Sequence, residues 1–199
     1  LFDEIGPDWA GMIGMEVVSE SLAAMNGKDI TVYLSTPGGS VDVGTDIFNA
    51  FERYKGKKTF VVDAIAASMG SYLLQVADVR VVSENSKLMI HNPWVITFGD
   101  EAMLRKEADI LAMYKKGMLP AYAERSKKSQ DEVSKLMDEE SWYLGAEIVS
   151  AGFADKVAGK AKNAIDMKRV AFWSHKAIPE SVAKHEQERG ISIAEAKAS

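Results

Sequence analysis

Hydrophobic positions near the start of the chain follow a strand pattern and then a helix pattern. Residues 30–35, Ile-Thr-Val-Tyr-Leu-Ser, are rich in β-branched and aromatic side chains and run into Thr-Pro-Gly-Gly, which predicts a buried strand ended by a turn. From Asp42 onward, apolar residues recur at helical spacing until about Lys55-Gly56. This segment therefore predicts a strand, a loop and a helix, in that order.

The same pattern then occurs a second time. Residues 59–65 form another apolar run, and the small residues of 66–71 lead into a helix-like stretch at 72–77. Short strands are expected at 79–82 and 87–90. Strands that alternate with helices at this spacing predict an α/β fold with a largely parallel sheet covered on both faces.

Two helices are predicted next, as an insertion into this sheet. Apolar side chains recur at helical period over about 100–125, and Pro120 is expected to kink this helix or to end a turn. The sequence Ser-Gln-Asp-Glu at 129–132 fits a capping box and predicts a shorter second helix. A short helix at 145–151 and an edge strand at 153–157 complete the predicted elements.

Length and charge divide the chain into a body and a tail. At roughly 150 residues per domain, 199 residues predict about one compact domain. Residues 1–155 carry 15 basic and 24 acidic side chains, whereas residues 156–199 carry 9 and 5, so an acidic body precedes a basic tail. The acidic body disfavours nucleic-acid binding. After Gly159 no apolar face persists, and we expect an arm that is partly disordered.

Composition excludes several chemistries and settings. Without cysteine the chain has no disulfide, thiolate metal site or cysteine nucleophile, and three histidines do not favour a multi-histidine metal centre, so we expect no metal and no cofactor. No apolar run reaches the roughly 18 residues of a membrane span, and no signal peptide is recognisable. We therefore expect a soluble, cytoplasmic protein without membrane contact. Because the first residue is Leu1, an N-terminal piece of the native protein is expected to be missing.

The strongest candidate nucleophile is Ser68. It lies between a predicted buried strand and a predicted helix start, where backbone N–H groups favour nearby negative charge. The alternative is an ordinary N-cap serine, which accepts a hydrogen bond from its own helix. The Pro37-Gly38-Gly39 loop follows the preceding strand, and glycine lets the backbone approach a ligand closely. Paired at one sheet edge, the two loops favour an oxyanion hole formed by the N–H groups of Gly39 and Met69.

An alkyl hydroxyl needs a neighbouring base to act as a nucleophile at neutral pH. His91 follows the strand at 87–90, so it lies at the same sheet edge as Ser68 and Gly39 if the strands are parallel. A histidine at a strand end can also be purely structural. A carboxylate should orient the imidazole. The residues alone do not choose among three adjacent candidates, Asp138, Glu139 and Glu140.

Four segments together resemble the ordered signature of ClpP-type serine peptidases. They are Ser-Thr-Pro-Gly-Gly-Ser-Val at 35–41, Ala-Ala-Ser-Met-Gly-Ser at 66–71, Met-Ile-His-Asn-Pro at 89–93, and Glu-Ser-Trp with Gly-Phe-Ala-Asp within 140–155. The likeness covers about residues 2–157. The opening Phe-Asp-Glu-Ile-Gly and the Glu-Ser-Trp segment are similar in particular to the ClpP-like head maturation (prohead) proteases of tailed bacteriophages and prophages.

The resemblance implies a serine endopeptidase that works through an acyl-enzyme. Ser68 would be the nucleophile, His91 the general base and acid, and the backbone N–H groups of Gly39 and Met69 the oxyanion donors. Glu140 falls where the family has its triad Asp; because Glu is one methylene longer, Asp138 or Glu139 could instead fill this place. Residues expected to contact substrate are Gly38, Asn92 and Trp94.

The resemblance also implies an architecture and an assembly. We expect the ClpP/crotonase-type spiral of ββα units in a peptidase domain over 1–159, with a helical handle at about 100–137 and a basic arm at 160–199. A homo-oligomer of one ring or stacked rings is expected, heptameric by family resemblance, acting on protein or peptide substrates. The sequence holds no P-loop, so any ATPase partner must be another chain, and whether one is used stays open.

Phage or prophage capsid, scaffold or portal precursors are the expected substrates. Two alternatives stay open: a crotonase-type enzyme that polarises thioesters of coenzyme A, which shares the spiral fold, and an inactive ring-forming subunit. The apolar residues that follow His91 are expected either to line the substrate groove or to form a buried handle contact; they are Trp94, Val95, Ile96 and Phe98.

Overall fold

The computed structural model describes residues 1–158, so the predicted basic arm at 160–199 lies outside the described residues. In chain order the elements are the 3₁₀ helix η1 (Asp8–Ala10), α1 (Met15–Met25), β1 (Ile30–Thr36), α2 (Val41–Arg53), β2 (Lys58–Ala67), α3 (Met69–Leu74), β3 (Val79–Ser83), β4 (Lys87–Ile90), α4 (Glu101–Ser126), α5 (Gln130–Asp138), β5 (Ser141–Leu144), α6 (Ala146–Ser150) and β6 (Lys156–Ala158). The predicted alternation of strands and helices in the first half is confirmed.

The six strands form one sheet in which β2 is the central strand. Its first half pairs in parallel with β3 and its second half with β4, while β1 runs parallel along the other side. β6 extends the sheet in parallel from β3, and β5 pairs antiparallel with β4. Because β2 changes partner halfway along its ten residues, the sheet curls instead of lying flat. The largely parallel sheet is therefore confirmed.

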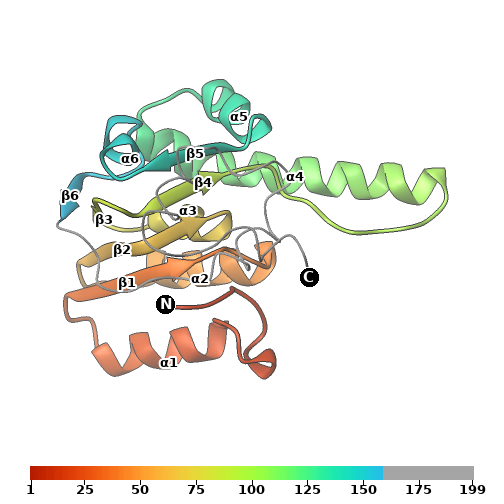
Figure 1. Cartoon of the computed structure of the whole chain (residues 1–199). Helices are drawn as coiled ribbons and strands as arrows, with labels where there is room; N and C mark the ends of the chain where they lie inside the picture. Colours follow the sequence, from red (N-terminus) through yellow and green to blue (C-terminus); the bar gives the residue numbers. More distant parts are fainter. Residues whose placement is uncertain (159–199) are drawn as a thin grey trace, which may run out of the picture.

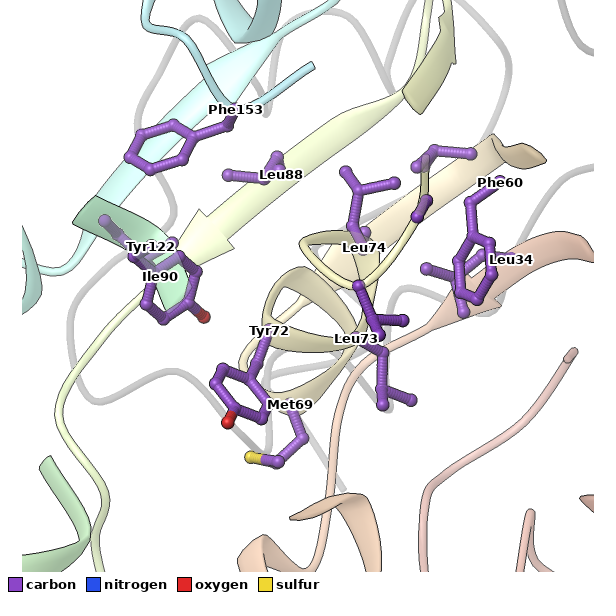
Figure 2. Packing of buried hydrophobic residues seen from close by; sticks show 14 of the residues in the cluster. Leu34, Phe60, Met69, Tyr72, Leu73, Leu74, Leu88, Ile90, Tyr122 and Phe153 are labelled. Atoms are coloured by element: carbon purple, nitrogen blue, oxygen red, sulfur yellow. The ribbon is translucent and has the colours of Figure 1, made fainter. Parts of the chain in front are cut away.

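Burial positions helices α2 and α3, through one apolar face in α2 and through the whole helix in α3. In α2 the buried residues Gly44, Ile47 and Phe51 recur at helical spacing, and the Ser40 hydroxyl caps its start by accepting from the Val43 N–H at 3.4 Å. Helix α3 is buried throughout. Figure 2 shows its side chains between two groups of core residues, with Leu34 and Phe60 on one side and Leu88, Ile90, Tyr122 and Phe153 on the other.

Helix α4 is the longest element and extends beyond the sheet (Figure 1). Its start is capped by Asp100, whose carboxylate accepts from the Met103 N–H at 2.9 Å. Pro120, which was expected to kink the helix or to end a turn, lies inside one α-helix that continues to Ser126. Packing of the buried residues Met118 and Tyr122 on either side of Pro120 holds this turn in place. Within residues 1–158, neither this helix nor any other is both long and apolar enough to cross a membrane.

Several elements differ from the predicted ones. Helix α3 begins three residues earlier than the predicted 72–77, because the Ser71 and Tyr72 N–H groups already donate to the Ser68 carbonyl. The final strand was predicted at 153–157, but β6 begins at Lys156. Phe153 and Asp155 are instead held by hydrogen bonds to Ile148 and Arg80.

Two elements were not predicted. Helix α1 buries only Val18 among its eleven residues, so its apolar period is weak. Strand β5 is half-buried along its whole length and shows no alternation of apolar and polar burial. It forms because β4 offers an open edge with which it can pair.

Candidate active site

The ends of strands β2 and β4 bring Ser68 and His91 together. Ala67 on β2 is paired with Met89 on β4, and the Ser68 N–H donates to the Met89 carbonyl at 3.0 Å. Since the two strands are parallel, the residues that follow them emerge at the same edge of the sheet. The Ser68 hydroxyl lies 2.8 Å from Nε2 of His91, which is buried with 6% exposure.

Ser68 occupies a strained turn between β2 and α3. Its φ of 52° and ψ of −123° lie in a region that residues other than glycine rarely adopt. The side chain makes no capping hydrogen bond to α3, so the alternative of an ordinary N-cap serine is wrong for this residue. A sharp strand-to-helix turn instead directs the hydroxyl towards the imidazole, the arrangement known for nucleophilic serines at such elbows.

The glycine loop after β1 packs against this turn, as expected. A Cβ atom added at Gly38 would lie 2.6 Å from the Ser68 Cβ and 3.0 Å from the Met69 nitrogen. Gly38 and Gly39 have φ of 104° and 141°, a conformation that side chains rarely permit. Both positions therefore require glycine for backbone shape and for space, Gly38 beside Ser68 and Gly39 beside the Ile5 carbonyl.

The N-terminal segment supports the loop, a role that the sequence reasoning missed. The Ile5 N–H donates to the Gly38 carbonyl at 2.7 Å, and the Ser40 N–H donates to the Ile5 carbonyl at 2.9 Å. This is a parallel bridge in which Ile5 faces Gly39. Ile5 bonds to Gly38 and Ser40, the two neighbours of Gly39. The N–H of Gly39 itself therefore points away from Ile5. A single bridge leaves no periodic signal in a sequence.

The three candidate carboxylates lie in different surroundings. Asp138 and Glu139 are exposed, whereas Glu140 is buried with 8% exposure. One step beyond the last pair of the β4–β5 ladder, Ile90 with Ser141, the next residues are His91 and Glu140. Glu140 has a φ of 51° and accepts a hydrogen bond from Trp142 Nε1 at 3.2 Å. Burial and register both favour Glu140.

Asp138 holds two other side chains. Its Oδ1 accepts from Asn92 Nδ2 at 2.8 Å and contacts the Lys115 ammonium at 2.7 Å. It therefore ties the residue after His91 to both helices of the insertion. The Asn92 amide, which we expected at the substrate, points to this carboxylate.

The apolar residues beyond Asn92 form an exposed stretch. Trp94 is half-buried, while Ile96 and Phe98 are 80% and 92% exposed. Both expected roles of these side chains, lining the substrate groove and forming a buried handle contact, stay predictions.

A second serine also contacts the turn. The Ser71 hydroxyl donates to the Ser68 carbonyl at 2.7 Å and lies 2.7 Å from the Tyr122 hydroxyl on α4. The sequence carried a partial signal, because a hydroxyl three residues after a helix start can reach back to the first carbonyl. Nothing in the sequence indicated Tyr122, which stands 51 positions from Ser71.

Comparison with known proteins agrees with this geometry. A family model described as Clp protease matches residues 14–161. The ATP-dependent Clp protease proteolytic subunit 1 of Leifsonia xyli subsp. xyli is 28% identical over 174 residues, which cover 81% of this chain and 88% of that protein. Subunits of the same name from Streptomyces avermitilis and Protochlamydia amoebophila are each 30% identical, over 131 and 135 residues.

These two alignments cover 65% and 66% of this chain and 60% and 66% of the relatives. The names describe proteolytic subunits and do not indicate a role in phage head maturation, so the likeness to prohead proteases stays a prediction. The expected spiral α/β fold agrees with the curled sheet and is confirmed. Since the family model matches well over half of the residues, the chain belongs to the Clp protease family.

Proposed function

We propose that the protein is a serine endopeptidase that cleaves peptide bonds through an acyl-enzyme. The observation that carries this proposal is the 2.8 Å contact between the Ser68 hydroxyl and His91 Nε2 at a strained strand-to-helix turn. His91 takes the hydroxyl proton while the oxygen attacks the substrate carbonyl, and it then protonates the leaving amine. A water molecule, deprotonated by His91, then attacks the acyl-enzyme ester, and His91 returns the proton to the serine oxygen as it leaves.

The oxyanion hole is formed by the N–H groups of Gly39 and Met69. Two observations support this assignment. The bridge to Ile5 leaves the Gly39 N–H directed away from the N-terminal segment. The Met69 nitrogen would lie 3.0 Å from a Cβ on Gly38, so the two donor loops are in direct contact. Two such donors stabilise the negative charge that develops on the carbonyl oxygen in the transition state.

Glu140 is the proposed third member of the triad. It is the buried acid of the three candidates and stands opposite His91 on the continued β4–β5 register. A carboxylate in this place holds the imidazole in the productive orientation and stabilises its charged form after proton transfer.

The substrates are extended peptide segments, and the assembly is a homo-oligomeric ring. On the side of the loop at Gly38 and Gly39 that faces away from Ile5, where the Gly39 N–H points, a substrate strand can add by β-augmentation. Trp94 and the exposed residues after it follow His91 in the chain and are proposed to line that groove. The peptidase domain, its handle and the heptameric ring follow from family resemblance, and an ATPase partner is not required for the chemistry itself.

Labelling of the serine tests this function. The assembled protein is treated with a fluorophosphonate, and the modified residue is identified by peptide mass spectrometry. We expect labelling at Ser68 and cleavage of casein, both abolished in Ser68→Ala, whose hydrolysis falls by several orders of magnitude while the fold is retained. Ser86→Ala, which removes a buried hydroxyl just before the start of β4, is the control and should remain fully active.

The alternatives predict different outcomes of the same experiment. An inactive ring-forming subunit gives an assembled ring with neither labelling nor cleavage of any unfolded substrate. A crotonase-type enzyme binds acyl-coenzyme A, and its activity survives Ser68→Ala. Either result contradicts the peptidase.

The phage role is proposed from the sequence motifs. The assembled protein is offered an unfolded generic protein and a phage capsid, scaffold or portal precursor at equal concentrations. Faster, site-specific processing of the phage precursor supports head maturation. Equal digestion of both supports a general peptidase instead.

A further inference from the structure

A chain of buried hydroxyls leads from helix α4 to the carbonyl of Ser68. The Tyr122 hydroxyl lies 2.7 Å from Ser71 Oγ, and Ser71 Oγ lies 2.7 Å from the Ser68 oxygen. Ser71 is 0% exposed and Tyr122 is 1% exposed. Figure 2 shows the Tyr122 oxygen on the side of the ring that faces α3. The contact therefore links the inserted helix to the turn that carries the proposed nucleophile.

The number of protons sets the direction of this chain. Each hydroxyl has one proton to donate. If Ser71 donates to the Ser68 carbonyl, Tyr122 donates to Ser71, and both bonds are 2.7 Å long. The reverse arrangement would leave Tyr122 to reach the Ser68 oxygen directly at 3.5 Å, which is a poor hydrogen bond. The relay therefore runs from Tyr122 to Ser71 to Ser68.

The surroundings keep Tyr122 protonated. Its ring packs edge-on against Tyr72 and Phe153, with centroids 5.9 and 6.1 Å away. Burial raises the pKa of Tyr122 far above its ordinary value, because the charged form would lose its water. The side chain is thus a permanent donor over the whole range of pH in which a histidine base works.

The Ser68 carbonyl belongs to the same peptide unit as the Met69 N–H. A peptide unit is planar and its C=O and N–H point in opposite directions, so whatever holds the oxygen also aims the hydrogen. The oxygen accepts from the Ser71 and Tyr72 N–H groups at 3.0 and 3.2 Å, as well as from the Ser71 hydroxyl. Hydrogen bonds in series also polarise one another, which strengthens the amide as a donor.

We propose that Ser71 and Tyr122 are positioning residues that aim and polarise the Met69 N–H as an oxyanion donor. This inference rests on the proposed peptidase function. It assigns to two side chains that do not touch the substrate a role in stabilising the transition state. It also assigns a role in the active site to the inserted helix α4 within the same chain.

The test uses Tyr122→Phe, Ser71→Ala and the double variant in the full-length assembled protein. Two control variants match them. Ser86→Ala removes a fully buried hydroxyl that donates to the carbonyl three residues back, as Ser71 does, but just before the start of β4, whereas His91 follows the end of that strand. Tyr54→Phe removes a hydroxyl that donates to the Lys28 carbonyl, near the beginning of β1.

We expect kcat for a peptide substrate to fall on the order of tenfold in each single variant, with KM within about twofold, since only transition-state binding is weakened. A peptide boronate, whose adduct places an oxygen in the oxyanion hole, should bind weaker by a similar factor. The pH at which activity rises should not move, because the relay does not touch His91. Adding Tyr122→Phe to Ser71→Ala should cause little further loss, since the relay is already broken.

Three results decide the matter. If the wild-type protein does not react with a fluorophosphonate at Ser68, the peptidase and this inference both fail. If the wild-type protein reacts but the variants match their controls in kcat and boronate affinity, the inference alone fails. The fraction of intact active sites is measured by titration with the fluorophosphonate. If the activity of a variant falls only in proportion to this fraction, the two hydroxyls serve to maintain the fold, and the inference also fails.

Discussion

Arg80 and Asp155 join the start of β3 to the segment that precedes β6. Arg80 Nη2 donates to one carboxylate oxygen of Asp155 at 2.6 Å, and the Arg80 backbone N–H donates to the other at 2.7 Å. The Arg80 side chain is buried, with 5% exposure, and also donates to Gln75 and to the Gly152 carbonyl. This ion pair holds the segment before β6 in place, so that β6 can pair with β3.

Removal of this carboxylate should destabilise the fold. Asp155→Asn leaves the buried guanidinium without its charged partner, which costs about 3–5 kcal/mol in a fully buried pair. Since Asp155 is 38% exposed, water offsets part of the loss, and we expect about 2 kcal/mol. Urea unfolding of the variant measures this value. Asp109→Asn, at an exposed position on α4, is the control and should change little.

The ion pair between Arg80 and Asp155 should also make the stability of the fold depend on pH. Burial raises the pKa of Asp155, but its hydrogen bonds from Arg80 outweigh this, so the pKa lies below the ordinary value of 3.8. A depressed pKa stabilises the folded state above 3.8, and this stabilisation disappears as the pH falls through the folded value. The difference in unfolding free energy between wild type and Asp155→Asn should therefore be largest at neutral pH and should shrink as the pH falls below 3.8. A difference independent of pH would contradict the pair's role.

Glu140→Gln tests the third position of the proposed triad. The amide keeps the shape of the side chain but cannot stabilise a charged imidazole, so kcat should fall by about 10³-fold with the fold intact. Glu139→Gln, one residue earlier and exposed, should retain activity. If Asp138→Asn causes the greater loss, the role belongs to Asp138. Kinetics on one peptide substrate compare all three variants.

Gly38→Ala should abolish activity through space and backbone shape. The added Cβ would lie 2.6 Å from the Ser68 Cβ and 2.8 Å from the Ala67 carbonyl oxygen, so the nucleophile or the loop must move. A displacement of about 1 Å costs on the order of 100-fold in rate. Gly117→Ala is the matched control on α4, where a Cβ meets nothing within 4 Å, and it should stabilise the helix by about 0.5–1 kcal/mol.

Pro120→Ala should stabilise helix α4. Proline inside a helix lacks the N–H that would bond to the carbonyl four residues earlier, and it costs roughly 3 kcal/mol in a helix interior. Because the exposed position lets water reach the freed carbonyl, we expect a gain of about 1–3 kcal/mol in the free energy of unfolding. Thermal unfolding of the variant measures it. An unchanged or lower stability would show that proline at this position is needed for packing of Met118 and Tyr122.

Local residue patterns were enough to predict the alternation of strands and helices, the position of the serine turn and the glycine loop. These features depend on neighbouring residues: β-branched runs end at glycines, and a serine stands between a buried strand and a helix start. Strand β5 and helix α1 could not be found this way, because their burial depends on what lies beside them and not on a period of their own.

Which side chains meet depends on contacts between distant parts of the chain. Parallel pairing of Ala67 with Met89 brings Ser68 to His91 across 23 positions, and antiparallel pairing of β5 with β4 puts Glu140 one step beyond the pair of Ile90 with Ser141. The hydroxyl relay from Tyr122 likewise exists only after α4 has packed on α3. Contacts between distant segments depend on sheet register and helix packing, which are set by burial in the whole molecule and not by local residue order.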